Sequence, residues 1–207
     1  MANMQPIIYQ EFGANIGRVH SLVKIYENLN SGQGRRPTHS TDLLRAAVVL
    51  LHASLEEVFR DLFRWCLPSA PREILNKIPL AGLGKKDPEK FFLGELVAFR
   101  GRFVDNVLFQ SVDEYASNNM TVNNTTEVAS CLEKLGIDPE PYEGFFTVLA
   151  EAMSRRHQIV HQADRNEKGG SGNHRAQSIS AAGVLRWVRN TEHFVDQLRE
   201  AEFPYAN

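Results

Sequence analysis

The segment from Asp42 to Leu67 constrains the fold more than any other part of the chain. Its first half is apolar on all sides of a helix, with apolar residues at positions 43, 44 and 46–51. Ser40 or Thr41 can cap this helix, and Pro68 ends it. Because a helix without a polar face has to be covered by other elements, we expect it to lie at the centre of a helical bundle.

Other segments repeat apolar residues at helical spacing. Thr125 or Thr126 can cap a short helix, and Gly136 suits its left-handed C-cap. Besides this short helix and the one that leads into residues 154–161, the expected helices cover residues 12–30, 87–107 and 179–200. We therefore predict an all-α fold, a helical bundle of four main helices with extra short helices.

The chain shows no internal repeat and no second core, so we expect a single domain over residues 1–207. Residues 1–11 would form an N-terminal extension. Residues 164–178 are rich in glycine and polar side chains, which predicts a flexible loop. This loop could act as a lid or a substrate contact, or it could simply be disordered.

Several aromatic and basic residues have two open interpretations. The segment 87–107 carries an aromatic stripe, which is more typical of a core than of a base-stacking surface. Its aromatic residues are Phe91, Phe92, Phe99 and Phe103. Arg100 and Arg102 could face solvent or a nucleic acid. Arg35 and Arg36 stand in a glycine-containing loop, where they could contact phosphate or only be solvated.

Composition excludes several classes of protein. The formal net charge is −2, so any contact with nucleic acid must depend on a local patch. No apolar stretch reaches membrane-spanning length, and residues 1–10 do not resemble a signal peptide. Cys66 and Cys131 are too few for a disulfide framework and lack zinc-ligand spacing, so we expect buried free thiols, a cytoplasmic location, and no metal or other cofactor.

The densest cluster of chemically active side chains is the stretch from Ser154 to His161, at the end of a patterned apolar helix. Asp138 and Pro139 are suited to begin this helix. Arg156 falls in the middle of its apolar face and Arg155 near the edge of that face. Because an isolated guanidinium is costly to desolvate, we expect Arg156 to have an anionic partner.

Glu56 is the best candidate for that partner. His52 and Glu56 lie four residues apart on one face of the helix 42–67, so they can also bond only each other. In the second interpretation, Glu56 orients Arg156 or His161.

The stretch Arg156-His157-Gln158-Ile159-Val160-His161 resembles the signature of HEPN domains, an arginine followed by a histidine after four to six residues. The context also resembles the RiboL-PSP-type branch of that family. A long hydrophobic helix carries Ala53-Ser54-Leu55-Glu56, the motif ends a later helix, and an amphipathic helix follows. The resemblance extends from about Thr38 to Leu198.

The resemblance implies a metal-independent endoribonuclease that cuts RNA by attack of the ribose 2′-hydroxyl. His161 would act as base or acid, Arg156 would bind the phosphate, and His157 and Glu56 would complete the catalytic group. Expected RNA contacts come from Arg155, Gln158 and Asp164. The family also implies a homodimer, an antitoxin or defence-system partner protein, and a role as a toxin or antiviral-defence effector.

One geometric condition has to be met. On a continuous helix, Arg156 and His161 point about 140° apart. The two side chains converge only if the helix ends or distorts before His161, or if a second subunit completes the site.

Two other functions fit part of the pattern. His157 and His161 have the spacing of a His-Glu-x-x-His zinc hydrolase, but Gln158 stands where the general base belongs. Alternatively, the chain is a non-catalytic HEPN module that dimerises or binds RNA or a partner protein.

Overall fold

The computed structural model describes residues 5–30, 38–81, 93–164 and 176–206. Within these residues the chain is helical and has no β-strand, which confirms the all-α prediction. The four long helices are α1 (Gln5–Leu29), α2 (Asp42–Cys66), α6 (Glu143–Gln162) and α7 (Ala181–Arg199). The shorter ones are α3 (Arg72–Leu75), α4 (Val104–Asn118) and α5 (Thr125–Lys134).

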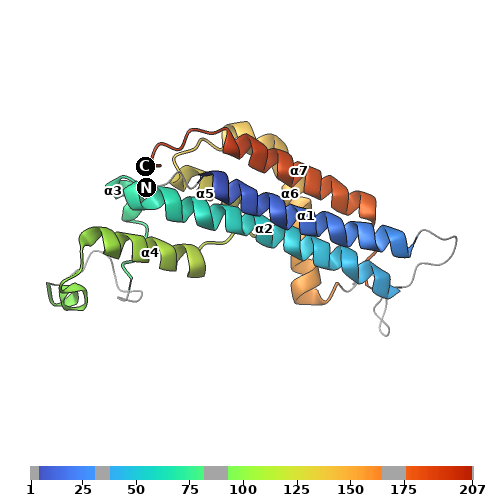
Figure 1. Ribbon diagram of the computed structural model, residues 1–207, viewed down its shortest axis with the longest axis horizontal. Coiled ribbons are helices and arrows are strands. Elements are labelled where there is room, and N and C mark those ends of the chain that lie inside the picture. The colour runs from blue at the N-terminus through green and yellow to red at the C-terminus, as the bar shows by residue number, and fades with distance from the viewer. Residues whose placement is uncertain (1–4, 31–37, 82–92, 165–175, 207) are drawn as a thin grey trace.

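Helix α2 is the central element, as its apolar sequence predicts. It contacts α1, α4, α6 and α7, and Figure 1 shows α4 on the side of α2 away from α7. Leu44, Phe59 and Leu62 are completely buried. The first half is not covered on every side, however, because Ala46 is exposed and Leu50 only partly buried. Other helices therefore cover most of α2 while one strip of its surface remains at the solvent.

The first helix is longer than its apolar pattern predicts. Helix α1 begins at Gln5 rather than at Phe12, and Ile8 and Tyr9 belong to the core. Much of the expected N-terminal extension is therefore part of the bundle. The basic pair Arg35 and Arg36 lies outside the described residues.

The helix expected over residues 87–107 is wrong in its described part. Residues Leu93–Phe99 form a 3₁₀ helix, Gly101 has a φ of 75°, and α4 begins only at Val104. Phe103 is 78% exposed, so this aromatic does not enter the core. Arg100 and Arg102 are exposed. Asp87, Phe91 and Phe92 lie outside the described residues.

The turns that precede α6 are set by local hydrogen bonds. Asn124, not Thr125 or Thr126, caps α5, because its Oδ1 accepts a hydrogen bond from the backbone N–H of Glu127 at 2.9 Å. Gly136 has a φ of 80°, the left-handed C-cap that its position predicts. Cys66 and Cys131 are free and buried, as expected.

Aromatic contacts fix α6 between α2 and α7. The ring of Phe194 on α7 lies 5.9 Å from Phe145 on α6, 5.5 Å from Tyr142, and 6.2 Å from Phe59 on α2, measured between ring centroids. Offset and edge contacts at these distances add to the burial of the rings. The start of α6 is thus held against α2 and α7, and the Arg-x4-His motif lies at the opposite end of the helix.

Candidate functional site

Helix α6 continues through the whole motif and ends only at Gln162. Ala163 closes it in the left-handed conformation, and the backbone N–H of Asp164 donates to the Gln158 carbonyl at 3.0 Å. The helix therefore does not break before His161, and Arg156 and His161 point to different sides of one protomer. Of the two conditions for their convergence, only the second subunit remains.

His157 and His161 lie next to each other on the exposed side of α6. Their ring centroids are 4.7 Å apart, which follows from the spacing of four residues on a continuous helix. Both side chains are exposed to solvent. They are therefore accessible to a substrate or to a second copy of the chain.

Arg155, rather than Arg156, is the buried arginine of the motif. It is 6% exposed, and its Nη2 donates to Asp164 Oδ2 at 2.8 Å and to the Gln177 carbonyl at 2.9 Å. Burial lowers the pKa of the Arg155 guanidinium, Asp164 opposes that shift, and the nearby charge of Arg45 adds to it. The helical pattern of the sequence places Arg155 only at the edge of the apolar face. It therefore did not predict that this guanidinium is buried in an ion pair.

Asp164 joins two helices. Its Oδ2 also accepts a hydrogen bond from Nε of Arg45 on α2 at 2.6 Å, and the carboxylate is 2% exposed. The buried carboxylate is held in an ion pair with two arginines, and the RNA contact expected of Asp164 stays a prediction. Sequence reasoning missed Arg45, although a single arginine within the apolar run 43–51 is a signal for such a pair.

Arg156 is half-buried and faces the other side of α6. Its Nη1 donates to Asn123 Oδ1 at 3.3 Å, and its Nε is buried without a hydrogen-bond partner among the described residues. No feature of the sequence around Asn123 indicated this contact. The Arg156 charge contributes to lowering the pKa of the Glu56 carboxyl, and the predicted pairing of these two residues stays a prediction.

Glu56 lies close to two basic side chains. Its carboxylate lies 3.5 Å from His52 Nε2 and 3.3 Å from Arg60 Nη2. Burial raises the pKa of the Glu56 carboxyl, but His52, Arg60 and Arg156 together lower it below its ordinary value. Glu56 is therefore held as a carboxylate beside His52 and Arg60, and its predicted role in orienting Arg156 or His161 stays a prediction.

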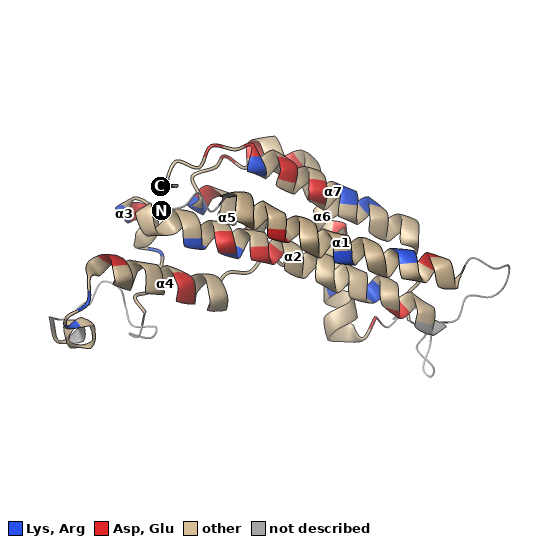
Figure 2. Ribbon diagram, viewed as in Figure 1, with Lys and Arg blue, Asp and Glu red and all other residues tan. Residues whose placement is uncertain are grey.

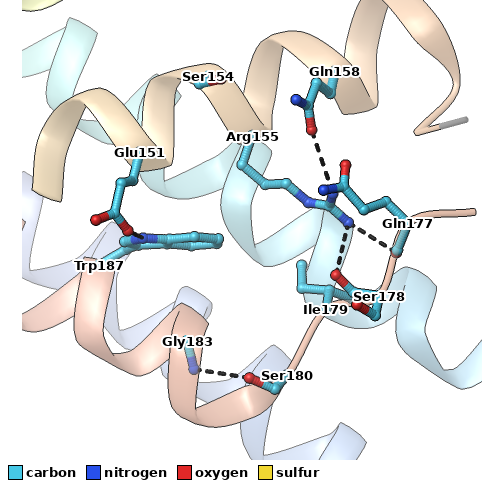
Figure 3. Close-up of a pocket in the computed structure, with 10 residues that line it drawn as sticks. All are labelled: Glu151, Ser154, Arg155, Gln158, Gln177, Ser178, Ile179, Ser180, Gly183 and Trp187. Atoms are coloured by element: carbon cyan, nitrogen blue, oxygen red, sulfur yellow. Dashed lines mark hydrogen bonds between the residues drawn. The ribbon is translucent and has the colours of Figure 1, made fainter. Parts of the chain in front are cut away.

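A pocket of about 380 Å³ lies between α6 and the start of α7 (Figure 3). The side chains of Arg155 and Gln158 form part of its wall on α6, and Trp187 forms part of its wall on α7. Gln158 is three residues before His161, and residues at this spacing are neighbours on a helix surface. The pocket therefore adjoins the exposed histidines on the side of α6 away from Arg156.

The distribution of charged residues and of potential metal ligands limits which reactions the described part of the chain can support. In Figure 2, acidic and basic segments are interspersed along α1, α2 and α7. Among the described residues, no group of three or more His, Cys, Asp or Glu side chains could hold a metal ion, so a zinc site at His157 and His161 has no third ligand there. None of the described helices is both long and apolar enough to cross a bilayer.

The catalytic roles predicted for Arg156, His161, His157 and Glu56, and the RNA contacts predicted for Arg155 and Gln158, stay predictions. What the geometry provides is a guanidinium near a carboxylate, two accessible imidazoles and an adjacent pocket. Comparisons with known proteins gave no match among curated proteins and none among solved structures. A family model described as RiboL-PSP-HEPN matches residues 14–201, so the chain belongs to the RiboL-PSP-type HEPN family.

Proposed function

We propose that this protein is a metal-independent endoribonuclease. The observation that carries the proposal is the complete Arg156 and His161 pair on the last turns of α6, in a chain of a family generally associated with ribonuclease activity. A guanidinium supplies fixed positive charge and forked donors for a phosphate, and an imidazole can transfer protons near neutral pH.

In the proposed reaction, the ribose 2′-hydroxyl attacks the adjacent phosphorus. A base removes the hydroxyl proton, an acid gives a proton to the departing 5′-oxygen, and the products are a 2′,3′-cyclic phosphate and a 5′-hydroxyl. His161 acts as the base or the acid, and Arg156 stabilises the charge that builds on the phosphorane. His157, beside His161, is the candidate for the second proton-transfer group, and Glu56 orients Arg156.

The site is proposed to form between two copies of the chain. Arg156 and His161 diverge on the continuous helix α6, so one protomer does not bring both groups to the same phosphate. A two-fold axis near the exposed histidines would bring Arg156 of one protomer toward His161 of the other. The exposure of His157 and His161 supports such an arrangement.

Family membership also supports a biological role as a toxin or as an antiviral-defence effector. Such a protein requires restraint, so an antitoxin or a defence-system partner is proposed to bind it. The RNA cut by the enzyme would then be a cellular or an invading transcript.

The second candidate function is a non-catalytic module that binds a partner. It is favoured by exposed apolar residues around the start of α4, where Phe103 is 78% and Val104 72% exposed. Surfaces of this kind mark interaction sites when they form a continuous patch.

The deciding experiment is cleavage of total RNA by the purified protein in excess EDTA, beside Arg156→Ala and His161→Ala. The enzyme proposal requires that the wild type cuts, that EDTA has no effect, and that both variants are inactive although folded. Loss of cutting in EDTA would point to metal chemistry. If no condition gives cutting while the variants stay folded, the binding-module function replaces the enzyme.

A further inference from the structure

We propose that the pocket between α6 and α7 binds one nucleotide of single-stranded RNA, with its base against Trp187. This inference rests on the proposed ribonuclease function and names a substrate subsite for it. No residue of this pocket other than Arg155 and Gln158 enters the predicted site, so Trp187 would be a new binding residue.

Trp187 is held in place as a wall of the pocket. Its Nε1 donates to Glu151 Oε2 at 3.3 Å, and Glu151 also forms an ion pair with Arg186. These contacts fix the indole at the interface of α6 and α7, where Figure 3 shows it edge-on. A fixed aromatic face is the surface on which an unpaired base stacks.

The sequence of α7 leaves space beside this ring. Gly183 stands one turn before Trp187, so the two positions share a face of α7. A Cβ added at Gly183 would meet only the hydroxyl of Ser180, at 3.2 Å. Position 183 therefore adds no side chain to the wall of the pocket.

The rest of the wall suits the polar edge of a base. Ser154 and Gln158 line the pocket from α6, and Gln177 lines it from the segment before α7. An amide offers both a donor and an acceptor, so these groups can hydrogen-bond the edge of any of the four bases. Single-stranded RNA is recognised by this combination of stacking and edge contacts.

The inner end of the pocket offers a guanidinium donor for a phosphate. Arg155 and Arg45 share the carboxylate of Asp164, and Arg45 also pairs with Asp42, so the two guanidiniums of this cluster are balanced by two carboxylates. Nη1 of Arg155 has two N–H donors and, among the described residues, one acceptor, Gln158 Oε1 at 3.4 Å. The acidic member of the wall, Glu151, is neutralised by Arg186 and lies beside the indole instead.

The pocket also lies next to the two histidines of the motif. Ser154 and Gln158 precede His157 and His161 by three residues each, so they are their neighbours on the surface of α6. A nucleotide in the pocket would continue directly onto the exposed histidines. The base bound by Trp187 therefore belongs to a nucleotide next to the phosphate that is cut.

The binding test uses tryptophan fluorescence, because the chain has only two tryptophans, Trp65 and Trp187. Trp65 packs against Phe203 on a different part of the bundle, so Trp65→Phe leaves Trp187 as the only reporter. His161→Ala is added to prevent cutting, and the probe is a 2′-O-methyl oligoribonucleotide of mixed sequence. We expect the oligonucleotide to quench Trp187 in a saturable way.

Affinity for the same oligonucleotide is then measured by fluorescence anisotropy in the His161→Ala background. Trp187→Ala should raise Kd by about 5- to 150-fold, the range expected for loss of one base–aromatic stack. Trp187→Phe should retain most of the affinity. Trp65→Ala, the matched control, should leave Kd unchanged, and melting curves show that each variant is folded.

Three outcomes would overturn the inference: bound oligonucleotide without a change of Trp187 emission, equal Kd for the Trp187 and Trp65 variants, or quenching by the four nucleoside monophosphates but not by the oligonucleotide. The last outcome would identify a site for free nucleotides. Because the 2′-O-methyl probe has no free 2′-hydroxyl to attack the phosphorus, binding is scored independently of cutting. If these binding tests fail while the parent enzyme cuts RNA, only the proposed nucleotide pocket is disproved, and the ribonuclease proposal is not.

Discussion

Arg155 and Asp164 form an ion pair of 2.8 Å in which both side chains are buried, with 7% and 2% exposed. Arg45 on α2 contacts the same carboxylate oxygen at 2.6 Å. Asp164 follows the left-handed end of α6, so the pair attaches this end to α2. The ion pair therefore determines where the last turn of α6, with His161, lies relative to the rest of the bundle.

Replacing Asp164 with Asn should lower the free energy of unfolding by about 3–5 kcal/mol, because the buried guanidinium of Arg155 and the partly buried one of Arg45 lose their shared counter-charge. Urea unfolding measures the loss. The matched control is Asp113→Asn, whose carboxylate accepts from Arg64 at 2.9 Å but is 62% exposed. An exposed pair should contribute no more than about 1 kcal/mol. Equal, small losses in both variants would contradict a structural role for the buried cluster.

The turn at Gly136 should not tolerate a side chain. Its φ is 80°, and a Cβ there would lie 2.6 Å from Pro204 Cγ and 2.9 Å from Tyr205 Cζ. Gly136→Ala should therefore cost at least the 1–2 kcal/mol of left-handed strain, by order of magnitude, and displace the segment after α7. Gly144→Ala is the control, because Gly144 is helical with nothing within 4 Å of its Cβ. That variant should be neutral or stabilised by up to about 1 kcal/mol, as seen in thermal melts.

The sequence predicted the bundle well because helical periodicity is a local property. The apolar stretch of α2, the amphipathic pattern of α7 and the turn at Gly136 can each be recognised within a few residues. The segment before α4 was assigned wrongly for the same reason. Its aromatic residues have helical spacing, but Gly101 adopts a positive φ and separates the 3₁₀ helix from α4.

The candidate site was predicted less completely, because its contacts are long-range. The motif and Glu56 were recognised, but the helical wheel placed Arg156 in the core and Arg155 at its edge. In the structure Arg155 is the buried arginine, because Asp164 folds back onto it. The other partner of Asp164, Arg45, is separated from Asp164 by 119 positions along the chain. The position of Arg45 in an apolar run signals a buried ion pair, but no local pattern identifies a partner at that distance, and the pocket at Trp187 depends on the packing of α6 against α7.

Glu56 should make stability depend on pH in the acid range. Burial raises its carboxyl pKa, but His52, Arg60 and Arg156 lower it more, so the folded pKa lies below the unfolded value of 4.5. A lowered carboxyl pKa stabilises the fold above the unfolded pKa, and this contribution is lost as the pH falls through the folded pKa. Urea unfolding of the wild type and Glu56→Gln between neutral pH and acid should show a gap that closes below pH 4.5. A gap that widens in acid would contradict this sign.

If each site combines Arg156 of one protomer with His161 of the other, a mixed dimer of two inactive variants should regain activity. Arg156→Ala and His161→Ala should each be inactive alone. In a dimer of one copy of each, Arg156 of the second variant can still meet His161 of the first, so one of the two sites is intact. If subunits assort at random, half of the dimers are mixed and each has one working site, which gives about one quarter of the wild-type activity.

The variants are unfolded together, refolded and assayed on RNA in EDTA, with two affinity tags to isolate the mixed dimer. Variants refolded separately and then combined on ice are the control and should stay inactive. If the purified mixed dimer is folded but inactive, the site does not combine Arg156 of one protomer with His161 of the other.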